Sequence, residues 1–168
     1  TVKRAIEVSS NVVMAKLAFD NYGSAPQKFY NNLVKFGFTK PIDIELPGAA
    51  KPMLAAPEKW SGVSAAYIAH GYELQVSPLH TLMFYNAIAN GGTMVKPYLV
   101  NRIEANGQMV KTFEPEVVEE KIADETNIKA AQQCMLAVTT EGTGKLVFKD
   151  ALYSAGGKTG TAHVAGKG

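Results

Sequence analysis

Two short stretches near opposite ends of the chain carry side chains that could act together on an acyl group. Residues 9–11 read Ser-Ser-Asn and residues 158–160 read Lys-Thr-Gly. Acyl transfer by a serine requires a base, a proton relay to the leaving group and donors for the oxyanion. In a turn, the hydroxyl and amide of Ser-x-Asn can face one cleft, whereas residues two apart within a helix diverge. Lys-Thr-Gly offers a cation and a hydroxyl to a carboxylate, and its glycine lets a substrate approach the backbone.

The glycine-lysine stretches do not fit a phosphate-binding loop. That motif has a glycine five positions before the Gly of Gly-Lys-Ser/Thr. The residue at this place is Leu152 for the Gly157-Lys158 pair and Thr139 for the Gly144-Lys145 pair. Leu146 also follows Lys145 where the motif needs Ser or Thr. We therefore set nucleotide binding aside.

Composition favours a globular protein without nucleic-acid or membrane partners. The chain has 168 residues, of which 46% are hydrophobic and 19% charged, with a net charge of +2. Such a length can bury a core, and such a charge is too small to indicate nucleic acid or an anionic membrane surface. Apolar runs are far shorter than the roughly 20 residues that span a bilayer, so we expect no membrane contact by this chain. His70 and His80 lie near no carboxylate cluster, so we expect no metal and no cofactor.

Local patterns place these stretches among helices and one hairpin. Asn106-Gly107, between two β-like runs, is typical of a two-residue hairpin turn, and Ser77-Pro78 is a strong helix start. Residues 41–61 carry four prolines and predict a long loop. The last expected element is an extended strand that carries Lys158. The order of helices, hairpin, helix and strand predicts a helix-rich α+β fold in a single domain, residues 1–168. The expected elements are a short helix over 1–8, helices over 12–21, 24–36, 77–90 and 126–140, and strands over 98–105 and 108–113.

From these two boxes outward, the whole chain resembles the transpeptidase domain of class B penicillin-binding proteins. The segments that carry the resemblance are FGF at 36–38, DIELPG at 43–48, residues 71–100 and EGTGK at 141–145. The resemblance implies part of a penicillin-binding-protein or β-lactamase-like domain, from a serine D,D-transpeptidase that cross-links peptidoglycan. Residues 71–100 look more like the division-specific type than the elongation type. Implied partners are peptidoglycan stem peptides, β-lactam antibiotics and, through the parent protein, other cell-wall synthesis and division proteins. The parent would lie at the extracytoplasmic face of the bacterial membrane, with an anchor outside this chain.

The resemblance also implies a role for each matching residue. Ser9 would relay a proton between the catalytic lysine and the leaving group, and Asn11 would hold the peptide carbonyl of the substrate. Lys158 and Thr159 would bind the carboxylate of a substrate or a β-lactam. The backbone N–H of Thr161 would form half of the oxyanion hole. Four further positions would lie at the substrate, within or beside these boxes and in the 142–145 segment: Ser10, Gly142, Thr143 and Gly160.

The chain departs from the family pattern in two places. The nucleophile box Ser-x-x-Lys is absent, since Lys3 is preceded by Thr1 at a spacing of two rather than three. In the family that box lies several dozen residues before Ser-x-Asn, so we expect it upstream of Thr1. The family also continues past Lys-Thr-Gly with further strands and a helix. We therefore expect the isolated chain to be inactive.

Other interpretations remain open at this point. Ser9 could be a helix cap, and residues 142–145 could be only a helix C-terminus. The chain could be a non-catalytic binding or assembly module in which the boxes are remnants. It could also belong to a serine β-lactamase or sensor on the same scaffold, although Glu45 and Glu58 in the 41–61 loop make no obvious deacylation motif.

Overall fold

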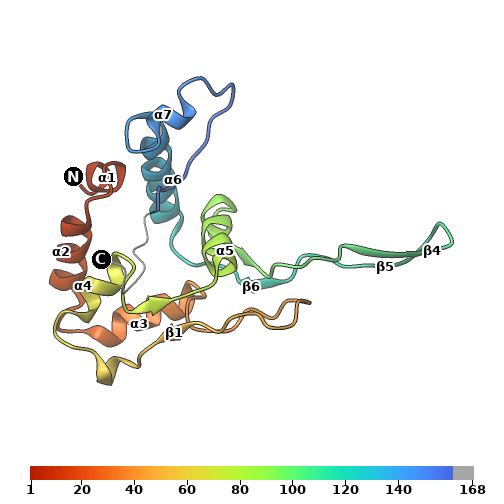
Figure 1. Ribbon diagram of the computed structural model, residues 1–168, viewed down its shortest axis with the longest axis horizontal. Helices are drawn as coiled ribbons and strands as arrows, with labels where there is room; N and C mark the ends of the chain where they lie inside the picture. Colours follow the sequence, from red (N-terminus) through yellow and green to blue (C-terminus); the bar gives the residue numbers. More distant parts are fainter. Residues whose placement is uncertain (161–168) are drawn as a thin grey trace, which may run out of the picture.

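The computed structural model describes residues 1–160, a group of helices with small antiparallel strand pairs, one of which projects away from the helices (Figure 1). The strands pair as β1–β2, β3–β6 and β4–β5. The predicted helix-rich α+β class is confirmed. In chain order the elements are α1 Val2–Glu7, α2 Asn11–Tyr22, α3 Pro26–Lys35, β1 Met53–Leu54, the 3₁₀ helix η1 Pro57–Lys59, α4 Ser64–Ala69, β2 Leu74–Gln75, α5 Pro78–Ala89, β3 Met94–Val95, β4 Arg102–Ala105, β5 Gln108–Thr112, β6 Val117–Glu119, α6 Glu125–Thr140 and α7 Lys145–Phe148.

Helix α5 begins where Ser77-Pro78 predicts, and a buried histidine fixes its first turn. The Ser77 N–H donates to Nδ1 of His80 over 3.2 Å, so Nδ1 is the acceptor. Nε2 therefore carries the proton and donates to the carbonyl of Lys40 over 3.0 Å. His80 is only 2% exposed. The neutral imidazole thus joins the start of α5 to the loop after α3.

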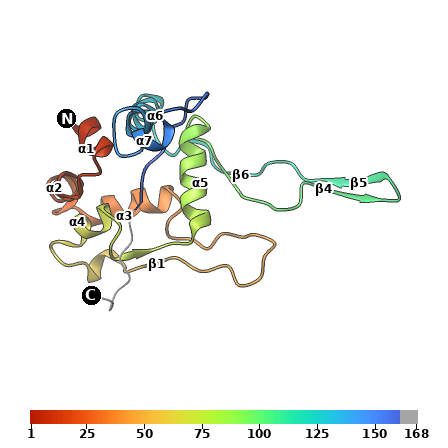
Figure 2. The same cartoon turned by 45° about the horizontal axis from the view of Figure 1, so that its top comes forward.

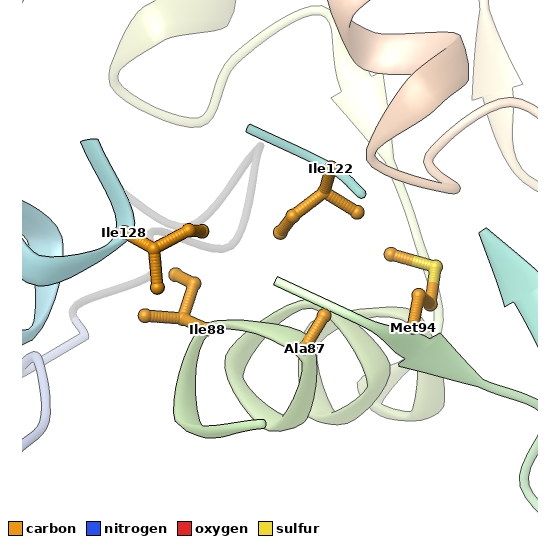
Figure 3. Packing of buried hydrophobic residues seen from close by; sticks show 5 residues of the cluster. All are labelled: Ala87, Ile88, Met94, Ile122 and Ile128. Atoms are coloured by element: carbon orange, nitrogen blue, oxygen red, sulfur yellow. The ribbon is translucent and has the colours of Figure 1, made fainter. Parts of the chain in front are cut away.

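The core lies where α5, β3 and α6 meet. Figure 3 shows side chains from these elements turned toward one another, together with Ile122 of the segment before α6. Met94 is completely buried, and Gly37, with φ of +78°, leaves room for its sulfur. Gln132 of α6 also donates to the carbonyl of Ile88 over 2.7 Å. The labelled members of this core are Ala87, Ile88, Met94, Ile122 and Ile128.

The predicted hairpin forms, but it stands away from the core. Asn106 and Gly107 have φ of 51° and 75°, as a type I′ turn requires. The first strand begins at Arg102 rather than Tyr98, and every residue of β4 and β5 is exposed. Figures 1 and 2 both show this ribbon projecting from the helices. Turn chemistry specified the hairpin, whereas nothing in the described residues covers either of its faces.

Several expectations for the first half of the chain were wrong. The 41–61 loop contains β1 and η1, and helix α4 had not been predicted. These elements depend on distant partners, since β1 pairs with β2 and Trp60 packs edge-on against Phe29. The apolar spacing within residues 12–21 predicts that Val13 faces inward, but Val13 is 38% exposed. Ala25 and Pro26, not Ser24, begin α3. Among residues 1–160, no helix has the length and apolar character that crossing a membrane requires.

We predict that Met94→Ala lowers the free energy of unfolding of the chain by about 2–5 kcal/mol, because it leaves a cavity in the core. Met109→Ala, on the hairpin, is the matched control, since Met109 is 60% exposed and should change stability by less than about 0.5 kcal/mol. Urea denaturation of both variants measures the difference. Equal losses would show that the core does not lie at Met94.

Candidate functional site

The turn between α1 and α2 holds Ser9 in an unusual backbone conformation. Ser9 has φ of 54°, a left-handed conformation that costs a non-glycine residue roughly 1–2 kcal/mol. Hydrogen bonds from Ser9 N–H to Ile6 and from Ser10 N–H to Ala5 close the turn at 3.2 and 2.8 Å. The Ser10 hydroxyl accepts from the Val13 N–H over 3.4 Å and thereby caps α2. The cap is therefore Ser10, which leaves the hydroxyl of Ser9 free for other partners.

The segment that carries Lys158 lies along helix α6 rather than in a sheet. Residues 155–160 do not form a strand, so the expected Lys-Thr-Gly strand is absent from this part of the chain. The Gly157 N–H donates to the carbonyl of Met135 over 3.1 Å, and the Thr139 hydroxyl donates to the carbonyl of Ala155. A strand requires a neighbouring strand, and residues 1–160 supply none at this place. Helix α6 therefore orients this segment.

The two boxes meet in space. The Lys158 ammonium donates to the Ser9 hydroxyl, although the two residues lie 149 positions apart in the chain. The Ser9 and Thr159 hydroxyl oxygens are 3.2 Å apart. Lys158 also donates to the carbonyl of Thr159 over 2.9 Å. The structure thus brings together an ammonium and two hydroxyls, which sequence reasoning had linked only by motif order.

Lys158 is a partly desolvated cation. Its side chain is half-buried, and this burial lowers the pKa of Lys158 below the ordinary lysine value of 10.5. Its hydrogen bonds within residues 1–160 go to the neutral oxygens of Ser9 and Thr159. A cation with neutral partners in a partly buried place attracts an anion more strongly than an exposed lysine does. The arrangement is suited to a carboxylate.

A third segment, between α6 and α7, supports this pair. The Thr143 hydroxyl lies 2.8 Å from the Thr159 hydroxyl, and the Thr143 N–H donates to the carbonyl of Glu7 over 3.0 Å. At Gly142, an added Cβ would lie 2.3 Å from that same carbonyl oxygen. Glycine is therefore required here for close backbone approach. Residues 142–143 join the end of α1 to the Lys158 segment.

Ser9, Lys158 and Thr159 line a cavity of about 550 Å³ between α1, α2, the end of α4 and the Lys158 segment. Sequence reasoning missed the wall that α4 supplies, where the rings of His70 and Tyr72 lie 5.2 Å apart at their centroids. This wall could not be predicted, because helix α4 was not predicted and nothing in the sequence indicated that residues 64–69 face residues 9–14. The lining residues are Ala5, Ile6, Ser9, Asn11, Met14, Ala69, His70, Tyr72, Lys158, Thr159 and Gly160.

The remaining predicted site residues fall into three groups. Asn11 and Gly160 line the cavity. Ser10, Gly142 and Thr143 do not line it, and their contacts are with the protein itself. Thr161, predicted to supply an oxyanion donor, lies outside the described residues.

A second cavity, of about 410 Å³, lies between α3, the 40–43 loop and the β3–β6 pair and contains none of the predicted site residues. Its rim holds an ion pair in which Lys96 and Asp43 are 2.6 Å apart. The Lys96 ammonium lowers the pKa of Asp43 through a hydrogen bond, and Asp43 in turn raises the pKa of Lys96. Both groups are thereby held in their charged, paired forms. We interpret this ion pair as a structural contact that holds the 40–43 loop against the segment directly after β3.

Comparison with known proteins identifies the family to which this chain belongs. The model of the family described as "Penicillin binding protein transpeptidase domain" matches residues 1–168. Among solved structures, the D,D-transpeptidase domain of a peptidoglycan glycosyltransferase from Eggerthella lenta is 26% identical, with a TM-score of 0.86 over 99% of this chain and 42% of that one. Penicillin-binding protein 3 of Mycobacterium tuberculosis, complexed with aztreonam, is 25% identical, with a TM-score of 0.74 over 86% of this chain and 33% of that one.

Among curated proteins, stage V sporulation protein D of Bacillus subtilis is 31% identical over 138 residues. That match covers 81% of this chain and 21% of the Bacillus protein, so the chain spans about a fifth of this relative. The chain belongs to the family of penicillin-binding-protein transpeptidase domains.

We predict that Gly142→Ala destabilises the chain by about 1–3 kcal/mol, because the new methyl group would overlap backbone atoms of Glu7. Gly157→Ala is the matched control, since nothing lies within 4 Å of its Cβ position. That control should stay within about 0.5 kcal/mol of the unaltered chain. Thermal unfolding of the two variants compares them, and similar melting temperatures would contradict the close approach.

We predict that the Lys158 ammonium titrates below pH 10.5, the ordinary lysine value. The folded state then binds fewer protons than the unfolded chain between the two pKa values. The contribution of Lys158 to the free energy of unfolding therefore rises as the pH rises through that interval. NMR titration of the side-chain signals that disappear in Lys158→Arg measures the pKa, and a midpoint at or above 10.5 would contradict the burial of this group.

Proposed function

We propose that this chain is one partial domain of a serine D,D-transpeptidase that cross-links peptidoglycan stem peptides. The observation that carries the proposal is the convergence of Ser9, Lys158 and Thr159 on one cavity. Family membership supports the class of reaction, and the D,D-transpeptidase domain from Eggerthella lenta supports the scaffold. A surface with a cation and hydroxyls suits the terminal carboxylate of a stem peptide.

In this proposal each site residue has a distinct task. The Lys158 ammonium and the Thr159 hydroxyl bind the carboxylate of the substrate, because both are donors beside the cavity. Ser9 relays a proton between the catalytic lysine of the nucleophile box and the leaving group, since its hydroxyl accepts from Lys158 and can donate onward. Asn11 holds the peptide carbonyl, and Thr161 supplies one oxyanion donor. Gly160 allows the substrate to lie close to the backbone.

The nucleophile comes from outside these residues, because no Ser-x-x-Lys sequence occurs among the 168 residues. Its hydroxyl attacks the carbonyl of the penultimate D-alanine, and the proton of that hydroxyl passes to the nitrogen of the terminal D-alanine. The peptide bond between the two alanines breaks, and the terminal D-alanine leaves with a free amine. The amine of a neighbouring stem then attacks the acyl-enzyme, which releases the serine and forms the cross-link. The isolated chain lacks the attacking group and should be inactive.

We further propose that β-lactams acylate the same serine, that Lys158 and Thr159 bind their anionic group, and that the enzyme acts in septal wall synthesis. The complex of the Mycobacterium tuberculosis relative with aztreonam supports the first point. The resemblance of residues 71–100 to the division-specific type supports the last. Such substrates place the complete protein at the outer face of the cell membrane, where it meets other wall-synthesis and division proteins.

A fluorescent penicillin tests the proposal on two proteins in parallel. The 168-residue chain should form no covalent adduct, and the complete protein that contains it should be labelled on the serine of a Ser-x-x-Lys box. Lys158→Ala in the complete protein should slow labelling by about 10-fold or more, because a charged hydrogen bond is worth about 1.5–3 kcal/mol. Lys111→Ala, on the exposed hairpin, is the control and should leave labelling unchanged.

Mass spectrometry locates the adduct and decides between the alternatives. An adduct on Ser9 or Ser10 would overturn the assigned roles. Absence of labelling in the complete protein would favour a non-catalytic binding module. Fast loss of the label, with release of hydrolysed penicillin, would favour a β-lactamase or sensor.

A further inference from the structure

We propose that Thr143 is a positioning residue, which fixes the hydroxyl of Thr159 for carboxylate binding without touching the substrate itself. The proposal rests on the proposed function and deepens it. Thr143 does not line the cavity, whereas Thr159 does. Its oxygen nevertheless lies 2.8 Å from that of Thr159, which is closer than Ser9 at 3.2 Å or Lys158 at 3.4 Å. Among residues 1–160, Thr143 is therefore the hydrogen-bonding side chain nearest to the Thr159 hydroxyl.

The hydrogen-bonding capacity of the Thr159 hydroxyl defines what Thr143 can contribute. A hydroxyl has one proton and two lone pairs. When Thr159 donates its proton to a carboxylate, its oxygen can only accept from its other neighbours. Thr143 can then donate to that oxygen, and Lys158 can also donate to it. Donors to a hydroxyl oxygen polarise it, so its own hydrogen bond to the anion becomes stronger.

The backbone of Thr143 is held firmly enough for this task. Its N–H donates to the Glu7 carbonyl over 3.0 Å, and the next amide, of Gly144, donates to Val138 at the end of α6 over 2.9 Å. Glu7 is only 4% exposed, and its carboxylate pairs with Arg4 at 2.8 Å. Gly142 lets the two backbones approach. The end of α1 and the end of α6 thus fix Thr143 from two sides.

The test uses the complete protein and two ligands, benzylpenicillin and its methyl ester, which lacks the carboxylate charge. Thr143→Val preserves shape and removes the hydroxyl. It should lower the second-order rate of acylation by benzylpenicillin about 3- to 10-fold, the worth of one hydrogen bond. The rate with the methyl ester should stay unchanged. Thr143→Ser should restore the rate with benzylpenicillin, because it restores the hydroxyl.

Thr140→Val is the matched control, since within residues 1–160 the Thr140 hydroxyl donates only to the Leu136 carbonyl of its own helix, over 3.0 Å. Thr143→Ala, which keeps the backbone N–H and adds no volume, repeats the test if the valine variant does not fold. An unchanged rate with benzylpenicillin, or equal losses for both ligands, would overturn the role of Thr143 alone. Failure of the unaltered protein to become acylated would overturn the proposed function and this role together.

Discussion

The hydrogen bond from the Lys158 ammonium to the Ser9 hydroxyl is the interaction on which the rest of the site depends. It joins residues 149 positions apart, so the cavity forms only when folding brings these distant segments together. It also carries a cost, because partial burial disfavours the charged form of Lys158 and lowers its pKa. Neutral oxygens from Ser9 and Thr159 compensate for part of that burial. The uncompensated charge remains available to an anion.

Helix α6 is the element that makes this bond possible. The Gly142–Thr143 segment directly after α6 contacts the end of α1. The carbonyl of Met135, within α6, accepts a hydrogen bond from the amide of Gly157. The same helix contributes Ile128 to the core that it shares with α5 and β3 (Figure 3). One rigid helix therefore connects the packed core to two walls of the cavity. The β4–β5 ribbon, which extends away from the helices, takes no part in this arrangement.

Local chemistry made part of the fold predictable. Ser77-Pro78 begins α5, and Asn106-Gly107 turns the hairpin, because both signals act within a few residues. The outward Val13, the unpredicted α4 and the missing Lys158 strand depend on contacts with distant segments, which no local pattern records. Helical periodicity alone could not show which face of α2 would be covered.

The site divides in the same way. The ordered pair of boxes pointed to Ser9, Lys158 and Thr159, and the structure brings these three side chains together. The sequence motifs could not reveal His70 and Tyr72, because the segment that carries them reaches the cavity only through tertiary packing. The motifs also could not distinguish residues that line the cavity from Thr143, which contacts Thr159 without lining the cavity itself.

A crystal structure of the complete protein acylated by benzylpenicillin tests the central claim most directly. The claim is that Ser9, Lys158 and Thr159 form the carboxylate-binding wall of an acyl-transfer cleft. We expect the ligand carboxylate to lie within hydrogen-bonding distance, about 2.5–3.2 Å, of Thr159 Oγ1. We also expect the acylated serine to lie outside the present 168 residues. A carboxylate bound away from Lys158 and Thr159, or an acyl group on Ser9, would contradict the claim.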